Sequence, residues 1–146
     1  MKNIIIGTVI TLIFTACSDE HKSNLKESSK LEDRYGISWA KNLKTAFELA
    51  KESKKNVMVM AQSVNCKWCK KMKQRTLCDK TVSKRLEKYI LVKVDKNIPN
   101  QIEELPPFKH VPIIFFMTPQ KEIIDNMRGY YTADDFLEYL NAIEKS

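Results

Sequence analysis

Blocks of apolar residues along the chain predict a series of strands. Residues 56–61 form a short apolar run between a lysine cluster and a polar turn, as in a buried strand. Residues 89–95, YILVKVD, are apolar almost throughout and predict an interior strand. Residues 110–117 predict another, which Pro112 opens at a position where strands tolerate proline. A turn then leads to a hairpin partner over residues 122–127.

Helical periodicity fills the segments between these strands. Ser38 is a suitable N-cap for a first helix, which would place five apolar residues on one face: Trp39, Leu43, Ala46, Phe47 and Ala50. Residues 70–76 lack Gly and Pro and consist mostly of good helix formers. Asp79 can cap a short third helix, and residues 97–105 predict a loop with a helical turn or two.

A capping-box-like pattern at Thr132 begins the last predicted helix. Its inward face would contain Phe136, Leu137, Leu140 and Ile143. The predicted order is helix, strand, helix, helix, strand, loop, strand, strand, helix. This order fits an α/β fold with a mixed central sheet and helices on both faces.

Cys66 and Cys69 stand in a C-x-x-C spacing at the start of the second predicted helix. The first sulfur would lie at the positive end of the helix dipole, where exposed N–H groups stabilise a thiolate. The second sulfur, one turn further along, could attack a mixed disulfide formed on the first. The spacing therefore favours dithiol exchange.

Other uses of a C-x-x-C pair are possible. A zinc site normally needs a second Cys or His pair, and Cys78 and His110 do not form one. A haem attachment site needs His directly after the second cysteine, where this chain has Lys70. An inert disulfide stays open, and so does copper(I), a soft ion that prefers thiolates and that Met60 or His110 could help to hold.

The N-terminus has the pattern of an export signal. Lys2 precedes an apolar run over residues 4–14, which is too short for a membrane span of about 20 residues. The run ends in Phe-Thr-Ala and Cys17, which resembles a lipoprotein signal in which Cys17 is lipidated. An ordinary cleaved signal is the alternative. We therefore expect a signal peptide at 1–16, a flexible tether at 17–35 and one domain at 36–146.

The formal net charge of +7 raises the question of nucleic acid. The lysines are spread through the predicted helices, no aromatic-basic recognition motif occurs, and the signal would export the chain. We therefore expect no nucleic-acid partner, and interpret the charges as a solvated face near anionic lipid.

The order of elements and the position of the C-x-x-C resemble the thioredoxin superfamily over residues 38–143. The chain is similar in particular to exported thioredoxin-like proteins with a Cys-x-x-Cys-Lys-Lys helix. The resemblance implies that Cys66 is the attacking thiol and Cys69 the resolving thiol. It also implies that Val111–Pro112 is a cis peptide beside the dithiol, where its backbone would pair with a substrate chain.

Two positions depart from the thioredoxin pattern. Met60 stands where thioredoxins usually have a buried acid that helps to deprotonate the resolving thiol. Lys67 and Trp68 replace the Gly-Pro between the cysteines. We expect Trp68 to shape a docking surface, Trp39 to be a core residue, and Cys78 to be a small buried residue rather than a third redox thiol. His110 is expected to face solvent.

These features predict a membrane-tethered periplasmic thiol–disulfide oxidoreductase of the protein disulfide reductase type. Its partners would be exported proteins with disulfides and a membrane or periplasmic thiol electron donor. We expect a monomer that needs no cofactor besides its dithiol. Ser18 after the lipidated cysteine is not acidic, which favours the outer membrane over the inner one. The predicted residues are Cys66, Cys69 and Pro112 for catalysis, Trp68 and Val111 for substrate, and Cys17 for lipidation.

Overall fold

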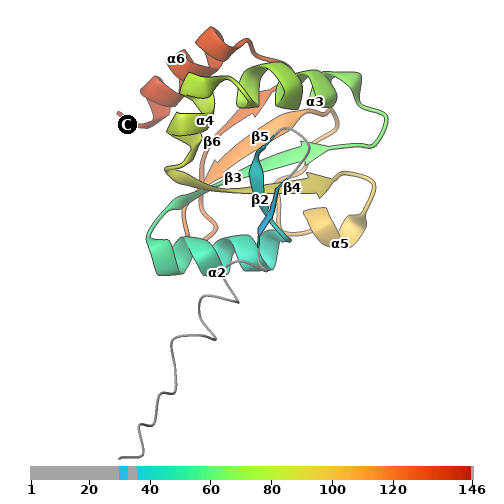
Figure 1. Ribbon diagram of the computed structural model, residues 1–146. Coiled ribbons are helices and arrows are strands. Elements are labelled where there is room, and N and C mark those ends of the chain that lie inside the picture. The colour runs from blue at the N-terminus through green and yellow to red at the C-terminus, as the bar shows by residue number, and fades with distance from the viewer. Residues whose placement is uncertain (1–29, 33–35, 146) are drawn as a thin grey trace, which may run out of the picture.

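A mixed sheet of six strands forms the centre of the computed structural model, which describes residues 30–32 and 36–145 (Figure 1). The strand order is β1-β2-β4-β3-β5-β6. β3 pairs parallel with β4 and antiparallel with β5, which confirms the predicted mixed sheet. The strands are β1 Lys30–Glu32, β2 Ser38–Ala40, β3 Asn56–Gln62, β4 Tyr89–Asp95, β5 Ile113–Met117 and β6 Ile123–Arg128.

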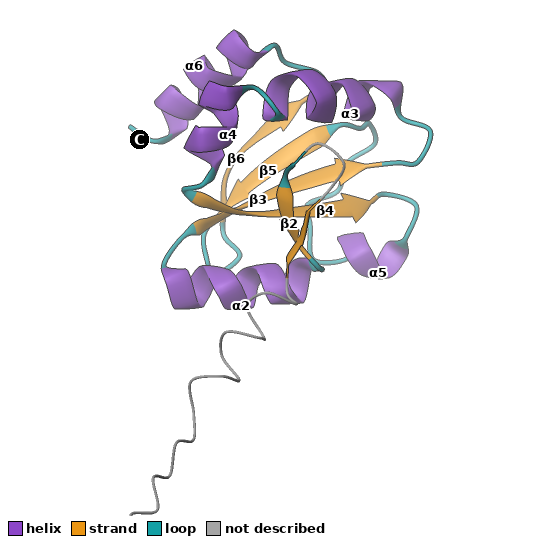
Figure 2. Cartoon of the chain, viewed as in Figure 1, coloured by secondary structure: helices purple, strands orange, loops and turns teal. Residues whose placement is uncertain are grey.

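Helices cover both faces of this sheet, as predicted (Figure 2). α2 and α5 pack on one face, and α3, η1, α4 and α6 pack on the other. The helices are α2 Leu43–Ser53, α3 Lys67–Lys71, the π-helical segment η1 Met72–Leu77, α4 Lys80–Leu86, α5 Pro99–Ile102 and α6 Ala133–Ile143.

Side-chain caps fix where several helices begin. The Asp79 carboxylate accepts the N–H groups of Thr81 and Val82 at 2.9 and 3.1 Å, which confirms it as the cap of α4. The Thr132 hydroxyl accepts the N–H of Asp135 at the start of α6, also as predicted. Such caps stabilise a helix by about 1 kcal/mol each.

The central strand β3 separates two hydrophobic cores. Its residues from Val57 to Ala61 are fully buried, and successive side chains point to opposite faces. Val57 and Val59 pack under α2 in the first core, whereas Met58 and Met60 pack in the second core with α3, α4 and α6. The second core is the one that supports the cysteine pair.

The start of the first helix was predicted wrongly. Ser38–Ala40 forms strand β2, and α2 begins only at Leu43 after its N-cap Asn42. Trp39 belongs to the second core, whereas Leu43 belongs to the first core, on the other side of the sheet. The chain crosses from one face to the other between them, so their helical spacing does not reflect a shared face.

Strand β1 lies within the range predicted as a tether, residues 17–35. It pairs antiparallel with β2, with Lys30 opposite Ala40. The predicted signal peptide at 1–16 and the lipidation site Cys17 lie outside the described residues. Among the described helices, none has the length and apolar character needed to cross a membrane.

The predicted helix over residues 70–76 changes its hydrogen-bond pattern along its length. α3 ends at Lys71 and the π-helical segment η1 follows it directly. At the end of η1, the Cys78 thiol donates to the carbonyl O of Lys73 at 2.7 Å. π-Helical turns are rare and occur often beside functional sites.

Glu144, just after α6, joins that helix to α4. Arg85 donates to both of its carboxylate oxygens at 2.8–3.1 Å, and Lys88 donates at 3.2 Å. Burial disfavours the ionised carboxyl, but the hydrogen bonds from Arg85 and Lys88 outweigh it and hold the pKa of Glu144 below its usual 4.5. Burial and the adjacent Glu144 raise the pKa of Tyr89 to about 12.

Candidate active site

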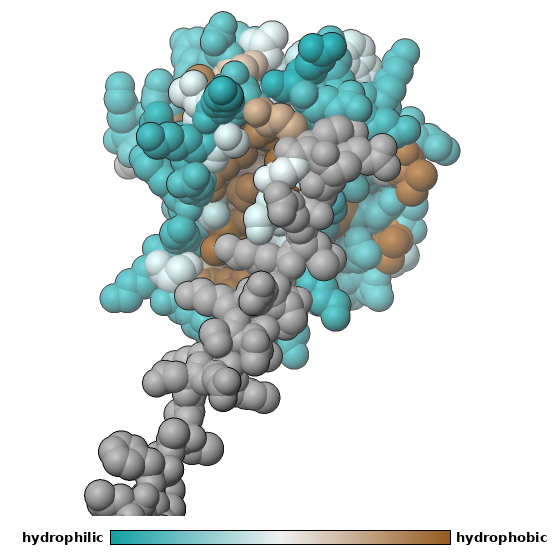
Figure 3. Space-filling model, viewed as in Figure 1, coloured by the Kyte–Doolittle hydropathy of each residue, from teal (hydrophilic) through white to brown (hydrophobic). Residues whose placement is uncertain are grey.

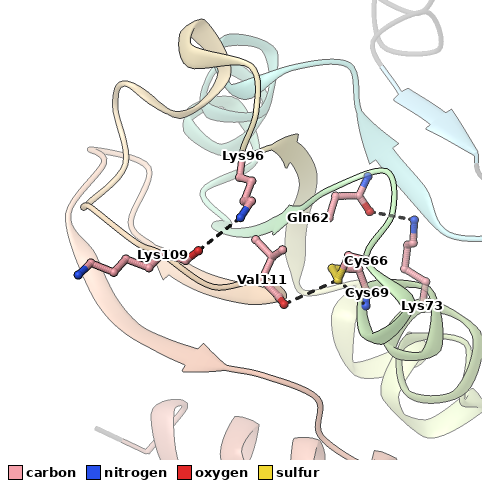
Figure 4. Close-up of a disulfide and its surroundings, with 7 residues drawn as sticks. All are labelled: Gln62, Cys66, Cys69, Lys73, Lys96, Lys109 and Val111. Carbon is pink, nitrogen blue, oxygen red and sulfur yellow. Dashed lines mark hydrogen bonds between the residues drawn. A yellow bond between two sulfur atoms is a disulfide. The ribbon is translucent and has the colours of Figure 1, made fainter.

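Cys66 and Cys69 form a disulfide at the point where the chain passes from β3 into α3 (Figure 4). Their Cα atoms lie 5.2 Å apart. Cys66 is the N-cap of α3, and its Sγ accepts the N–H of Cys69 at 3.0 Å. The same N–H would stabilise negative charge on Cys66 once the disulfide is reduced.

The two sulfurs differ in their access to solvent. Cys69 is 1% exposed and packs in the second core, which also contains Met60 and Met72. Cys66 is only partly buried. An external disulfide can therefore reach Cys66 and not Cys69.

The loop before β5 lies against the disulfide. Val111–Pro112 is a cis peptide, as the family resemblance implied, and the Val111 carbonyl O lies 3.7 Å from the Cys66 Sγ (Figure 4). The Pro112 carbonyl accepts the N–H of Gly129 at 2.8 Å, at the end of β6. These contacts place Val111 at the sulfur and Pro112 in the sheet.

A groove of about 410 Å³ adjoins this loop. Pro112 is buried in its wall, whereas His110 is exposed, as expected for a loop histidine. The Lys96 ammonium donates to the Lys109 carbonyl at 3.5 Å and ties the loop to the end of β4 (Figure 4). Val111, whose carbonyl O lies beside the Cys66 Sγ, lines the groove, whereas neither cysteine does.

Trp68, predicted as a docking residue, is 48% exposed next to Cys69. Its ring lies 5.7 Å from the ring of Tyr130, measured between centroids. The Lys71 ammonium lies 5.0 Å from the Trp68 centroid and 4.4 Å from the Tyr130 centroid. Tyr130 and Lys71 therefore hold Trp68 in place, through a tilted aromatic contact and a cation–π contact.

Tyr130 was not predicted from the sequence, because its place beside the dithiol depends on how β6 pairs with β5. Arg128 pairs with Ile113 across β5 and β6, so the residues after the hairpin partner must return to the proline loop. Gln62 was also missed. Its Oε1 accepts the Lys73 ammonium at 2.9 Å and joins the end of β3 to η1 (Figure 4).

Cys78 is partly buried and forms no disulfide with Cys66 or Cys69, which are bonded to each other. It lines a cavity of about 560 Å³ with Ile37 and Leu86, and Figure 3 shows hydrophobic side chains in a hollow between α4 and α2. Trp39 is 1% exposed and is a core residue, as predicted. Over the described residues, no group of three or more His, Cys, Asp or Glu side chains is arranged to hold a metal.

Three solved structures share the fold of this chain. A thioredoxin from Thermus thermophilus is 24% identical with a TM-score of 0.60, over 70% of this chain and 83% of its own. The DsbH oxidoreductase is 15% identical with a TM-score of 0.62, over 75% and 85%. The oxidised C-terminal domain of DsbD from Neisseria meningitidis is 24% identical with a TM-score of 0.56, over 68% and 91%.

A search of curated proteins found none that matches the chain. The family described as a thioredoxin-like domain matches residues 43–144, which include the cysteine pair, the cis proline and all four strands from β3 to β6. The chain therefore belongs to the thioredoxin-like domain family.

Proposed function

We propose that the chain is a thiol–disulfide oxidoreductase of the protein disulfide reductase type, acting through Cys66 and Cys69. The main support is the asymmetric disulfide, with a reachable Cys66 beside the Val111 carbonyl and a buried Cys69 behind it. The oxidoreductases among the similar structures agree with this activity. The fold and the dithiol are common to the family, whereas the activity of this chain is the proposal.

In the reduced protein, the Cys66 thiolate attacks one sulfur of a partner disulfide. The partner S–S bond breaks, a Cys66 mixed disulfide forms, and the other partner sulfur leaves as a thiolate. The Cys69 sulfur then attacks the Cys66 sulfur and releases the second partner thiolate. Two electrons pass to the partner, the Cys66–Cys69 disulfide forms, and a dithiol electron donor later restores the reduced state.

The environment of Cys69 affects the second step. Met60 lies fully buried in the same core as Cys69 and has no group that accepts a proton. The Cys69 proton therefore passes by water to the departing partner thiolate. Val111 and Pro112 position the partner backbone, and Trp68 contacts the partner surface beside the reacting sulfur.

Substitution of each cysteine tests the activity. Cys66→Ser should abolish reduction of a protein disulfide such as that of insulin, because the attacking sulfur is lost. Cys69→Ser should accumulate a mixed disulfide on residue 66, detectable by mass spectrometry. Cys78→Ser is the matched control and should keep full activity. Equal activity of Cys66→Ser and the unsubstituted protein would disprove the proposal.

The cellular location is a separate part of the proposal. The apolar run over residues 4–14 followed by Cys17 supports export, lipidation at Cys17 and attachment to the periplasmic face of the outer membrane. The partners would then be exported proteins with disulfides and a thiol electron donor in the periplasm or membrane. The chain should fractionate with membranes, and Cys17→Ser should not. Recovery of the unmodified wild type from the soluble periplasm would contradict lipidation.

A further inference from the structure

The segments around the disulfide contain basic residues and no acidic ones. Residues 63–78 and residues 107–112 have no Asp or Glu, and neither do residues 128–132 after β6. These three segments provide the cysteine pair, the proline loop and Tyr130. The exposed cations on them are Lys67, Lys70, Lys71, Arg75, Lys109 and Arg128.

Three of these cations lie on the helix that starts at the dithiol. Lys67, Lys70 and Lys71 are exposed, and within the described part of the chain no ion pair joins them to a carboxylate. Lys71 is also held at a defined place by the rings of Trp68 and Tyr130. Their positive charge is therefore available for electrostatic interaction with a partner polypeptide that approaches Cys66.

Asp95 is an acid at the end of β4, opposite Gln62. Its carboxylate accepts the N–H of Asn97 at 2.9 Å and is followed directly in sequence by Lys96. Among the described residues, Asp95 forms no ion pair with Lys67, Lys70 or Lys71.

The centre of the same surface is apolar. Val64 is 75% exposed and Trp68 is 48% exposed, and they lie two residues before and two residues after Cys66. An apolar centre with a charged rim is the usual arrangement of a protein-binding surface. Here the exposed charged residues of the three segments around the disulfide are all cations.

We infer that the substrates are polypeptide segments whose disulfide is flanked by acidic residues. This inference rests on the proposed function, and it concerns the encounter that precedes attack by Cys66. Complementary charge mainly raises the association rate, and it does so less as salt increases. Partners with basic flanks would be disfavoured by repulsion at the same lysines.

Three synthetic disulfide peptides test the inference, identical except for Glu, Gln or Lys beside the disulfide. The measurement is the second-order rate constant of the reduced protein with each peptide, at low and at physiological ionic strength. We expect the Glu peptide to react about tenfold faster than the Gln peptide at low salt and the Lys peptide to react slowest. The ratio between Glu and Gln peptides should fall as salt is added.

The combined variant Lys67→Gln, Lys70→Gln and Lys71→Gln should bring the Glu-to-Gln ratio close to one. The control, Lys41→Gln, Lys44→Gln and Lys51→Gln, removes the same charge from exposed positions on or beside α2, which covers the other face of the sheet, and should keep the ratio.

Two outcomes separate this inference from the proposed function. Equal rates for the Glu and Gln peptides, or equal ratios in the two triple variants, would overturn the acidic-substrate inference while leaving the reductase activity intact. Failure to reduce any of the three peptides would overturn the proposed function and this inference with it.

Discussion

At the scale of single residues, Met60 and Trp68 distinguish this dithiol from that of thioredoxin. Met60 is fully buried in the same core as Cys69, and the described residues of that core include no carboxylate that could take the proton of the resolving thiol. Trp68 places a large, half-exposed ring between the two cysteines in sequence. Met60 affects how the proton of the Cys69 thiol is transferred, and Trp68 affects which surface of a partner the dithiol region contacts.

Trp68→Ala should slow reduction of a protein disulfide by about fivefold, since an aromatic contact contributes about 1 kcal/mol and a factor of ten is about 1.4 kcal/mol. Trp68→Phe should retain most of the rate because the ring still faces Tyr130. Both variants should react with a small soluble disulfide at the rate of the wild type. An unchanged rate for Trp68→Ala with the protein substrate would show that the ring does not contact the partner.

The residues around the dithiol were predictable to different degrees. The spacing of Cys66 and Cys69 and the proline at the start of β5 are visible in the sequence, because each has a specific chemical role there. The contacts of Tyr130 and Gln62 depend on how β6 and η1 return to the site. Such contacts are set by tertiary packing, and no local pattern in the sequence encodes them.

At the scale of elements, the mistaken start of α2 shows a limit of periodicity. Trp39 and Leu43 have the spacing of neighbours on a helix, yet they lie in different cores. A three-residue strand such as β2 is too short for the alternation of buried and exposed residues to be recognised in the sequence. Its apolar residues were therefore assigned to the helical pattern of the longer segment that follows. The π-helical turn at Met72–Leu77 likewise has no sequence signature, because it consists of ordinary helix formers.

The contacts of Glu144 with Arg85 and Lys88, which connect α6 to α4, predict how stability against urea depends on pH. Glu144→Gln should lower the midpoint of urea unfolding at pH 7, because the carboxylate that accepts from Arg85 and Lys88 is lost. The folded pKa of Glu144 is depressed, so its stabilisation is present above the usual value of 4.5 and is lost as pH falls through the folded pKa. The difference between variant and wild type should therefore shrink as the pH falls below 4.5 and through the folded pKa.

A matched control comes from a more exposed pair. Glu104 meets Lys121 at 2.6 Å, but their side chains are 46% and 44% exposed. Exposed pairs of this kind contribute little to stability. Glu104→Gln should leave the urea midpoint unchanged at every pH, and a loss equal to that of Glu144→Gln would contradict the role of the link.

At the scale of the whole molecule, the sequence predicted the layers correctly, because long apolar strands and capped amphipathic helices leave few ways to cover a sheet. The strand β1 was not predicted, since Lys30–Glu32 is a polar stretch whose pairing depends on β2. The remaining strands were predicted from their apolar runs, and the structure adds their order, β2-β4-β3-β5-β6. Exposed lysines on α3 form a basic surface beside the dithiol.

That surface should also affect the redox potential. Cations near Cys66 stabilise its thiolate and hence the reduced protein, which makes the disulfide more oxidising than that of thioredoxin at about −270 mV. The variant without Lys67, Lys70 and Lys71 should have a potential lower by about 10–30 mV at low salt. Equilibration with glutathione at fixed pH measures this shift. The same potential in both proteins would show that the lysines act on partners alone.

The hydrogen bond from the Gly129 N–H to the Pro112 carbonyl limits which main-chain groups are available to a partner polypeptide. Proline has no N–H, and the Pro112 carbonyl already accepts the N–H of Gly129, so residue 112 has no main-chain group to pair with a partner. In the cis peptide unit, backbone pairing with a partner then falls to Val111, whose carbonyl O lies 3.7 Å from the Cys66 Sγ. A partner that pairs with one peptide unit is aligned at its disulfide but forms few backbone contacts along its length. It should therefore dissociate quickly once its disulfide is reduced.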